Sequence, residues 1–210
     1  MEVLDTPCLL LMDTQIKYPV VEHFYTLQGE GYWTGTAAYF IRLAGCDVGC
    51  FWCDVKESWE IAGHDQLTLS ELISAVNSVP SNRVVITGGE PFLHNLEPLC
   101  KALSNKKLHV ETSGTSPYSG NFDWICFSPK KFKKPLPQYY QIANELKIIV
   151  HNRHDLAWAE EHAALCKPDT YLYLQPEWYT PQTIEWIIEY VKQNPKWRIS
   201  LQTHKYLNIP

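Results

Sequence analysis

The chain concentrates three of its seven cysteines in one stretch, Arg42-Leu-Ala-Gly-Cys-Asp-Val-Gly-Cys-Phe-Trp-Cys-Asp54. Cys46, Cys50 and Cys53 follow the spacing C-x3-C-x2-C, which allows three thiolates to face one inorganic centre. A structural zinc site has four protein ligands, and a [4Fe–4S] cluster is usually bound by four cysteines. Three thiolates therefore leave one coordination position for a ligand that is not protein. We therefore hypothesise that the three cysteines bind a centre with one open coordination position, and the other motifs test this hypothesis.

Two other interpretations of the loop stay open at this point. A zinc site would need a fourth ligand, and His64 is the candidate. Three purely structural cysteines so close together would oxidise readily. Seven is an odd number, so the cysteines cannot all pair in disulfides. The remaining four are expected to be small core residues: Cys8, Cys100, Cys126 and Cys166.

Length and composition predict a single domain, 1–210, with residues 1–17 as an N-terminal extension. Hydrophobic residues make up 45% and charged residues 20%, which is typical of a soluble globular protein. The net charge of −5 argues against broad binding to nucleic acid or anionic membranes. No apolar run is long enough to span a bilayer, and no secretory signal is present. We therefore expect a cytoplasmic protein that binds neither nucleic acid nor membrane.

Short apolar runs alternate with helical patterns along the chain. The expected strands are 20–25, 37–43, 83–87, 108–112, 124–127, 145–150, 171–174 and 197–201. The expected helices are 68–76, 96–103, 156–165 and 181–193. This alternation predicts an α/β fold with about six mostly parallel strands. The pattern leaves an open doubly wound sheet and an incomplete barrel as alternatives.

Polar clusters recur where the expected strands end. Thr26-Leu-Gln-Gly-Glu-Gly31 follows the first strand, and Gly88-Gly-Glu-Pro91 follows a strand that is apolar throughout. Ser128-Pro-Lys130 and Gln175 follow two later strands. Because α/β folds bind ligands at the carboxyl ends of their strands, these clusters are expected to surround one site.

The loop Cys50-Phe-Trp52-Cys53 together with Gly88-Gly-Glu-Pro91 resembles the motifs of radical S-adenosylmethionine (SAM) enzymes. The resemblance implies a partial (β/α) barrel with trimmed helices and a [4Fe–4S] cluster whose open iron binds SAM. Cleavage of SAM would then give a 5′-deoxyadenosyl radical. By the same resemblance, Cys46, Cys50 and Cys53 bind the cluster. The residues expected to contact SAM are Trp52, Cys53, Asp54, Gly89, Glu90, Ser128, Pro129, Lys130 and Gln175.

A narrower resemblance, to the 7-carboxy-7-deazaguanine synthase family, covers nearly the entire chain. It rests on Thr26–Gly31, Arg42, Thr87–Pro91 and the tail Gln202-Thr-His-Lys-Tyr-Leu-Asn-Ile-Pro210. It implies a lyase that contracts the ring of 6-carboxy-5,6,7,8-tetrahydropterin with loss of ammonia, on the route to queuosine and other 7-deazapurines. The tail 202–210 is then expected to fold into the site. The residues implied to bind the pterin are Leu27, Gln28, Gly29, Glu30, Arg42, Thr87, His204 and Pro210.

The chain departs from this family at one residue. The family typically has a threonine after Cys-Asp that helps to bind Mg²⁺ against the substrate carboxylate, and this chain has Val55. Mg²⁺ is therefore expected to bind through substrate, water and Asp54. The implied partners are an external one-electron donor such as flavodoxin and a second copy of the chain in a homodimer. A glycyl-radical enzyme activase and a non-enzymatic zinc-binding module are the alternative functions.

Overall fold

The computed structural model describes residues 16–210, which form one mixed nine-stranded sheet with helices on its outer side. The strands are β1 (Lys17–Leu27), β2 (Ala37–Leu43), β3 (Asp65–Thr68), β4 (Arg83–Gly88), β5 (Lys107–Thr112), β6 (Trp124–Phe127), β7 (Glu145–Val150), β8 (Tyr171–Pro176) and β9 (Trp197–Ile199). The helices are α2 (Leu69–Asn77), α3 (Glu97–Ala102), α4 (Tyr139–Ile142), α5 (His154–Ala163), α6 (Thr183–Gln193) and α7 (Thr203–Leu207). Short 3₁₀ turns lie at Lys56–Ser58 and Pro91–Leu93.

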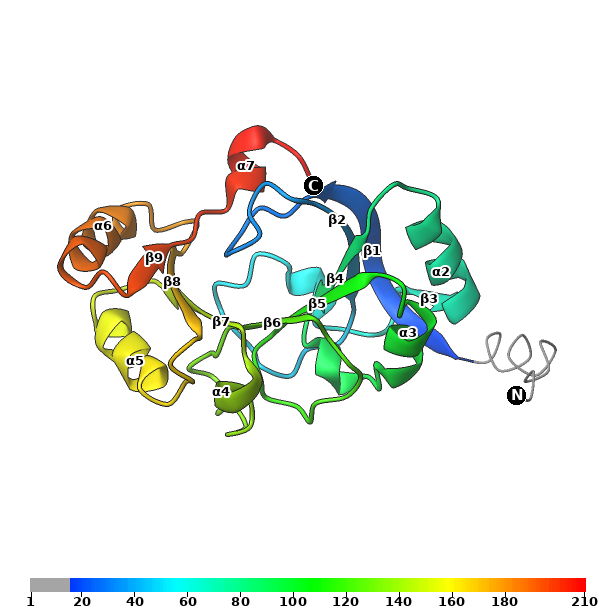
Figure 1. Ribbon diagram of the computed structural model, residues 1–210, viewed down its shortest axis with the longest axis horizontal. Coiled ribbons are helices and arrows are strands. Elements are labelled where there is room, and N and C mark those ends of the chain that lie inside the picture. The colour runs from blue at the N-terminus through cyan, green and yellow to red at the C-terminus, as the bar shows by residue number, and fades with distance from the viewer. Residues whose placement is uncertain (1–15) are drawn as a thin grey trace.

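The strand order is β3-β1-β2-β4-β5-β6-β7-β8-β9, and every neighbouring pair from β2 to β9 is parallel. β1 runs antiparallel to β2, and β3 runs antiparallel to β1. The sheet curves into an arc without closing, with α2 to α6 outside the arc and the cyan loop after β2 inside it (Figure 1). The expected α/β fold with a partial barrel is therefore confirmed.

The main differences from the expected elements lie at the edges of the sheet. β3 was not predicted, because Asp65-Gln-Leu-Thr has little apolar character; it pairs with β1, and Leu67 packs against the main core. β1 begins at Lys17, so this residue is not part of an extension. Residues 1–15 of the expected extension, with Cys8, lie outside the described residues. Cys100 and Cys126 are buried as expected, whereas Cys166 is only partly buried.

Alternation along each strand separates the core from the inside of the arc. Ile41, Ile86 and Ile148 are fully buried in the main core, to which the surrounding helices contribute side chains such as Leu72 and Ile187. The residues next to these isoleucines along each strand point the other way, because successive side chains in a strand face opposite sides. The core therefore lies outside the arc, and polar groups gather inside it.

Candidate active site

Five parallel strands each place one polar side chain on the inner face of the arc. Arg42 comes from β2, Thr87 from β4, Glu111 from β5, Lys147 from β7 and Gln175 from β8. Register aligns these positions, since Arg42 lies beside Thr87 in the ladder between β2 and β4. All five line one cavity of about 240 Å³. The fold thus brings together side chains that are far apart in the sequence.

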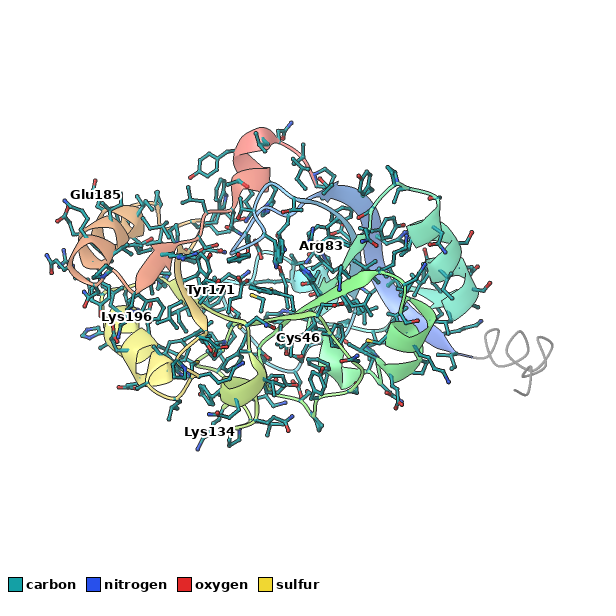
Figure 2. The ribbon with its side chains drawn as sticks, in the orientation of Figure 1. Cys46, Arg83, Lys134, Tyr171, Glu185 and Lys196 are labelled. Atoms are coloured by element: carbon teal, nitrogen blue, oxygen red, sulfur yellow. The ribbon has the colours of Figure 1, made fainter. Side chains whose placement is uncertain are left out.

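The cysteine loop forms one wall of this cavity. Cys46, Cys50 and Cys53 all line it, and Cys46 lies toward the middle of the molecule (Figure 2). Burial raises the pKa of the Cys50 thiol to about 11, and the nearby Lys130 ammonium opposes that rise. Thiolates are the form that binds metal, so loading this site releases protons.

The Gly88-Gly-Glu-Pro91 motif holds the cysteine loop in place through its backbone. Gly89 N donates to Leu43 O (3.0 Å) and Glu90 N donates to Gly45 O (2.8 Å). A Cβ on Gly89 would lie 2.3 Å from Gly45 O and 2.7 Å from the Cβ of Cys46. Only glycine therefore permits this close approach.

Glu90 lies behind the cavity and is fully buried. Its carboxylate accepts hydrogen bonds from Thr112 Oγ1 (2.6 Å), from Ser113 N (2.8 Å) and from the Ser113 hydroxyl. Its side chain thus fastens the end of β5 to the motif instead of facing the cavity. Pro129 is likewise absent from the lining, within the described part of the chain.

The other residues expected to bind cofactor or substrate surround the cavity. The lining includes the expected cofactor residues Trp52, Cys53, Asp54, Gly89, Ser128, Lys130 and Gln175. It also includes every residue expected to contact the pterin: Leu27, Gln28, Gly29, Glu30, Arg42, Thr87, His204 and Pro210. The two sets share one space, as a reaction between cofactor and substrate requires.

Two charged residues of the cavity, Lys147 and Glu111, were not predicted from the sequence. The Lys147 ammonium pairs with the Glu30 carboxylate, and both are largely buried. Burial alone would raise the pKa of Glu30, but the charge of Lys147 outweighs it and lowers that pKa. Glu111 accepts from Gln28 Nε2 (2.9 Å) and Thr87 Oγ1 (3.3 Å). Period-two alternation in Leu108–Thr112 and Glu145–Val150 was the signal that could have found both.

The tail closes the gap between the two ends of the arc. Thr203 N and Oγ1 both donate to Gly29 O, at 2.9 and 3.0 Å. Gln202 Nε2 donates to Glu30 Oε1 (2.9 Å), and this places α7 against the loop after β1. Pro210, beyond α7, reaches the cavity. The tail was expected to fold into the site, but its helix was not predicted, because 203–207 lacks an apolar repeat.

Val55 also lines the cavity, next to Asp54. The Asp54 carboxylate accepts from Lys205 Nζ (2.7 Å) and from Gln202 Nε2 (3.3 Å). Burial raises the pKa of Asp54, but Lys205 outweighs this and the pKa is lowered overall. The carboxylate next to Val55 in the sequence, that of Asp54, is therefore already paired with Lys205 and would have to exchange this partner to bind Mg²⁺.

The geometry does not favour a single zinc ion. No group of three His, Cys, Asp or Glu side chains converges on one metal position within residues 16–210. His64, the suggested fourth ligand, is bonded through Nε2 to Glu57 O (2.8 Å) and does not line the cavity. A cluster has different requirements, because each thiolate binds a different iron and the sulfurs need not meet at a point.

An open parallel sheet curved around a cavity, with three cysteines on one wall, defines an iron–sulfur protein of the radical SAM type. A family model described as a 4Fe-4S single cluster domain matches residues 27–165. None of the helices within 16–210 has the length and apolar character needed to cross a membrane.

Comparison with known proteins gives the particular family. A 7-carboxy-7-deazaguanine synthase from Flavobacterium psychrophilum is 52% identical, covering 91% of this chain and 92% of the relative. One from Synechocystis is 50% identical, covering 92% and 94%. The crystal structure of QueE from Escherichia coli superposes with a TM-score of 0.81 at 32% identity, covering 94% and 99%. The chain belongs to the 7-carboxy-7-deazaguanine synthase family and is an enzyme of the radical SAM type.

Proposed function

We propose that this enzyme converts 6-carboxy-5,6,7,8-tetrahydropterin to 7-carboxy-7-deazaguanine with loss of ammonia, in queuosine or related 7-deazapurine biosynthesis. One observation carries the proposal: the three cysteines and all eight residues expected to contact the pterin line a single cavity. A glycyl-radical activase acts on a large protein partner, so it would have no use for an inner face lined with buried charges. A zinc module is disfavoured by the geometry of the cysteines.

The residues around the loop fit the cofactors that this reaction needs. Cys46, Cys50 and Cys53 would hold the cluster, with SAM against Gly89 and Trp52 on the same side of the cavity. When bound, cluster and SAM would supply the one-electron chemistry that removes a hydrogen atom from the substrate. Trp52 offers an aromatic face for adenine, and Ser128 and Gln175 offer hydrogen-bonding groups for ribose and adenine.

Recognition of the substrate would fall to other residues of the same cavity lining. Arg42 Nε donates a hydrogen bond to Glu22 Oε1 (2.6 Å). The two Nη groups carry four further N–H donors, which suit a substrate carboxylate. Gln28 and Thr87 supply groups for the ring edge, beside Glu30 held ionised by Lys147. The pterin is flat and polar, so a narrow cavity lined with such groups suits it.

Four further features belong to the same proposal. Mg²⁺ would bind through the substrate carboxylate, water and Asp54, in competition with Lys205. An external electron donor such as flavodoxin would approach the cluster beside Phe51, whose side chain is exposed between Cys50 and Cys53. A homodimer would use part of the exposed aromatic surface, which includes Tyr25 and Tyr32. The protein would act in the cytoplasm, where thiols stay reduced.

Anaerobic reconstitution followed by turnover tests the proposal. Purified protein is loaded with iron and sulfide, reduced, and incubated with SAM and 6-carboxytetrahydropterin. We expect the visible absorbance of an iron–sulfur cluster and the formation of 7-carboxy-7-deazaguanine with one ammonia per turnover. A colourless protein that binds one zinc would contradict the proposal at the cofactor, and a loaded protein that forms no product would contradict it at the substrate.

A further inference from the structure

The parallel strands begin around one opening of the curved sheet. A layer of aromatic rings closes this opening, and we call this layer the floor. Tyr32 and Trp33, from the loop after β1, pack on Trp124 at the start of β6, with ring centroids 4.9 and 5.5 Å apart. Tyr32 also packs on Tyr171 at the start of β8 (4.6 Å). The Arg83 guanidinium lies 4.1 Å from the centre of the Trp33 ring. This floor separates the inside of the arc from solvent.

A small chamber of about 10 Å³ lies between the floor and the active-site cavity. We call it the floor chamber, and its lining comprises Gln28, Glu30, Trp33, Val85, His109, Val110, Glu111, Trp124, Cys126 and Glu145. Gln28, Glu30 and Glu111 also line the active-site cavity, so they form a wall shared by the two spaces. A volume of roughly 10–15 Å³ on this measure holds one water molecule.

Two residues of the chamber lining, Trp33 and Trp124, carry buried hydrogen-bond donors. The indole nitrogens of Trp33 and Trp124 are both buried, and neither has a hydrogen-bond partner among residues 16–210. Buried indole N–H groups usually find a partner, because leaving one unbonded in a low-dielectric interior is unfavourable. Trp197 shows the usual case, since its buried indole donates to Glu160 Oε1 (2.8 Å).

Besides Glu30, which is paired with Lys147, the chamber lining has the carboxylates of Glu111 and Glu145, and both already accept other hydrogen bonds. Glu145 accepts from Tyr32 N (2.9 Å), and Glu111 accepts from Gln28 and Thr87. Each carboxylate has about four lone-pair positions, so both have capacity for another donor. An occupant must accept from the indoles and donate to these carboxylates. Water has two lone pairs and two protons and can do both. Ammonium has no lone pair for an indole, and an anion would face Glu111 and Glu145.

We propose that the floor chamber binds one ordered water molecule, which accepts hydrogen bonds from the indoles of Trp33 and Trp124 and donates to Glu111 and Glu145. The water site itself follows from the chamber and its donors. Its role rests on the proposed function: Glu111 faces the substrate cavity, and the water fixes the orientation of its carboxylate from behind. Trp33 and Trp124 are then positioning residues, which act on the substrate only through this water and Glu111.

Indole signals report the water directly, without turnover. The holoenzyme with its cluster in the diamagnetic oxidised state is labelled with ¹⁵N-tryptophan, and the indole signals are assigned from single Trp→Phe variants. We expect the Nε1–H protons of Trp33 and Trp124 to show cross-relaxation with a long-lived bound water, and that of Trp197 to show none. A crystal structure that resolves ordered water elsewhere should show density within hydrogen-bond reach of both indoles. If neither indole shows cross-relaxation with a bound water, or if the crystal structure shows no water density in the chamber, the proposed water site is wrong.

The positioning role has its own test. Trp33→Phe and Trp124→Phe each remove one donor to the water, and we expect KM for the pterin to rise about three- to tenfold with kcat within about twofold. Trp186→Phe, on the surface helix α6, is the matched control and should leave KM unchanged. If both floor variants lower the melting temperature but leave KM at the wild-type value, the indoles are merely structural and the positioning role is wrong. A wild-type protein that shows the water but no turnover would count against the proposed function alone.

Discussion

The ammonium of Lys147 and the carboxylate of Glu30 form an ion pair on the inner face of the arc, joining the middle of β7 to the loop that follows β1. Burial alone would lower the pKa of Lys147, but carboxylates around it, Glu111, Glu30 and Glu145 among them, raise it well above the ordinary value. Lys147 is therefore the cation that balances a cluster of acidic side chains at the centre of the fold.

Replacing Lys147 with methionine should destabilise the protein strongly. Removing one partner of a buried ion pair leaves an uncompensated charge, which costs about 3–5 kcal/mol, or on the order of 10 °C in melting temperature for a chain of this size. Calorimetry under anaerobic conditions measures the change. Lys192→Met is the control, because Lys192 and Glu189 are paired on the surface and such pairs contribute about 0–1 kcal/mol. Equal melting temperatures for the two variants would contradict the prediction.

Gly89→Ala should prevent assembly of the cluster. The new Cβ would collide with Gly45 O and with Cys46, so the cysteine loop must move away from its position. We expect iron and sulfide content per chain to fall severalfold after reconstitution. Gly35→Ala is the control: its φ is positive, at +83°, unlike that of Gly89, but among the described residues nothing lies within 4 Å of the added Cβ. The control should lose about 1–2 kcal/mol of stability from backbone strain and keep its cluster.

Deletion of Ile209–Pro210 should weaken substrate binding without affecting the cluster. Pro210 lines the cavity, and Ile209 N donates to His204 O (3.1 Å), which keeps the end of the tail against α7. We expect KM for the pterin to rise at least about tenfold, because such a rise corresponds to the loss of one or two charge-assisted hydrogen bonds. The iron content should not change. Leu207→Ala, an exposed position in the same helix, controls for general damage to the tail. Unchanged turnover after the deletion would show that the tail has no part in binding.

Stability should fall as the pH drops from about 6.5 to 4, in part because of His162. Burial lowers the pKa of His162 to about 4, and its Nδ1 is hydrogen-bonded to the Tyr140 hydroxyl (2.8 Å). The unfolded chain takes up this proton near the ordinary pKa of about 6.5. Between these two values the unfolded state binds more protons, so the free energy of unfolding decreases with falling pH.

Denaturant unfolding at several pH values checks this dependence. His162→Gln removes one titrating group and should reduce the slope between pH values of about 6.5 and 4; the part due to His109, whose pKa burial lowers to about 3, should remain. His154→Gln, at an exposed position, should keep the wild-type slope. A His162→Gln protein with the same slope as the wild type would assign the acid sensitivity to other groups, such as the buried carboxylates.

The sequence was informative wherever a local pattern determined the structure. Ala37–Leu43, Trp124–Phe127 and Glu145–Val150 have the predicted bounds, because each is a short run of mostly apolar residues. The three cysteines of the C-x3-C-x2-C spacing line one cavity, and Gln202, His204 and Pro210 from the tail line the same cavity.

The remainder depended on contacts that no short stretch encodes. Lys147 lies within the apolar run Glu145–Val150, and its partner Glu30 is more than a hundred residues away. β3 forms its ladder with β1, which lies far from it in the sequence. The side chain of Glu90 belongs to a recognisable motif, yet three-dimensional packing turns it toward Thr112 and Ser113 instead of the cavity. The residues of the floor chamber likewise come from separate strands and a loop.

The gap between the two ends of the arc is bridged by hydrogen bonds from 200–203 to 29–31, among them Gly31 N to Ser200 Oγ (2.9 Å) and Thr203 N to Gly29 O. These contacts join segments about as distant in sequence as the domain permits, and such contacts form late because a long loop must close first. The catalytic cavity should therefore be the last part of the molecule to assemble during folding. It should also be the first to open in partial unfolding, since no strand ladder within residues 16–210 crosses the gap. Substrate affinity would then decline before global unfolding begins.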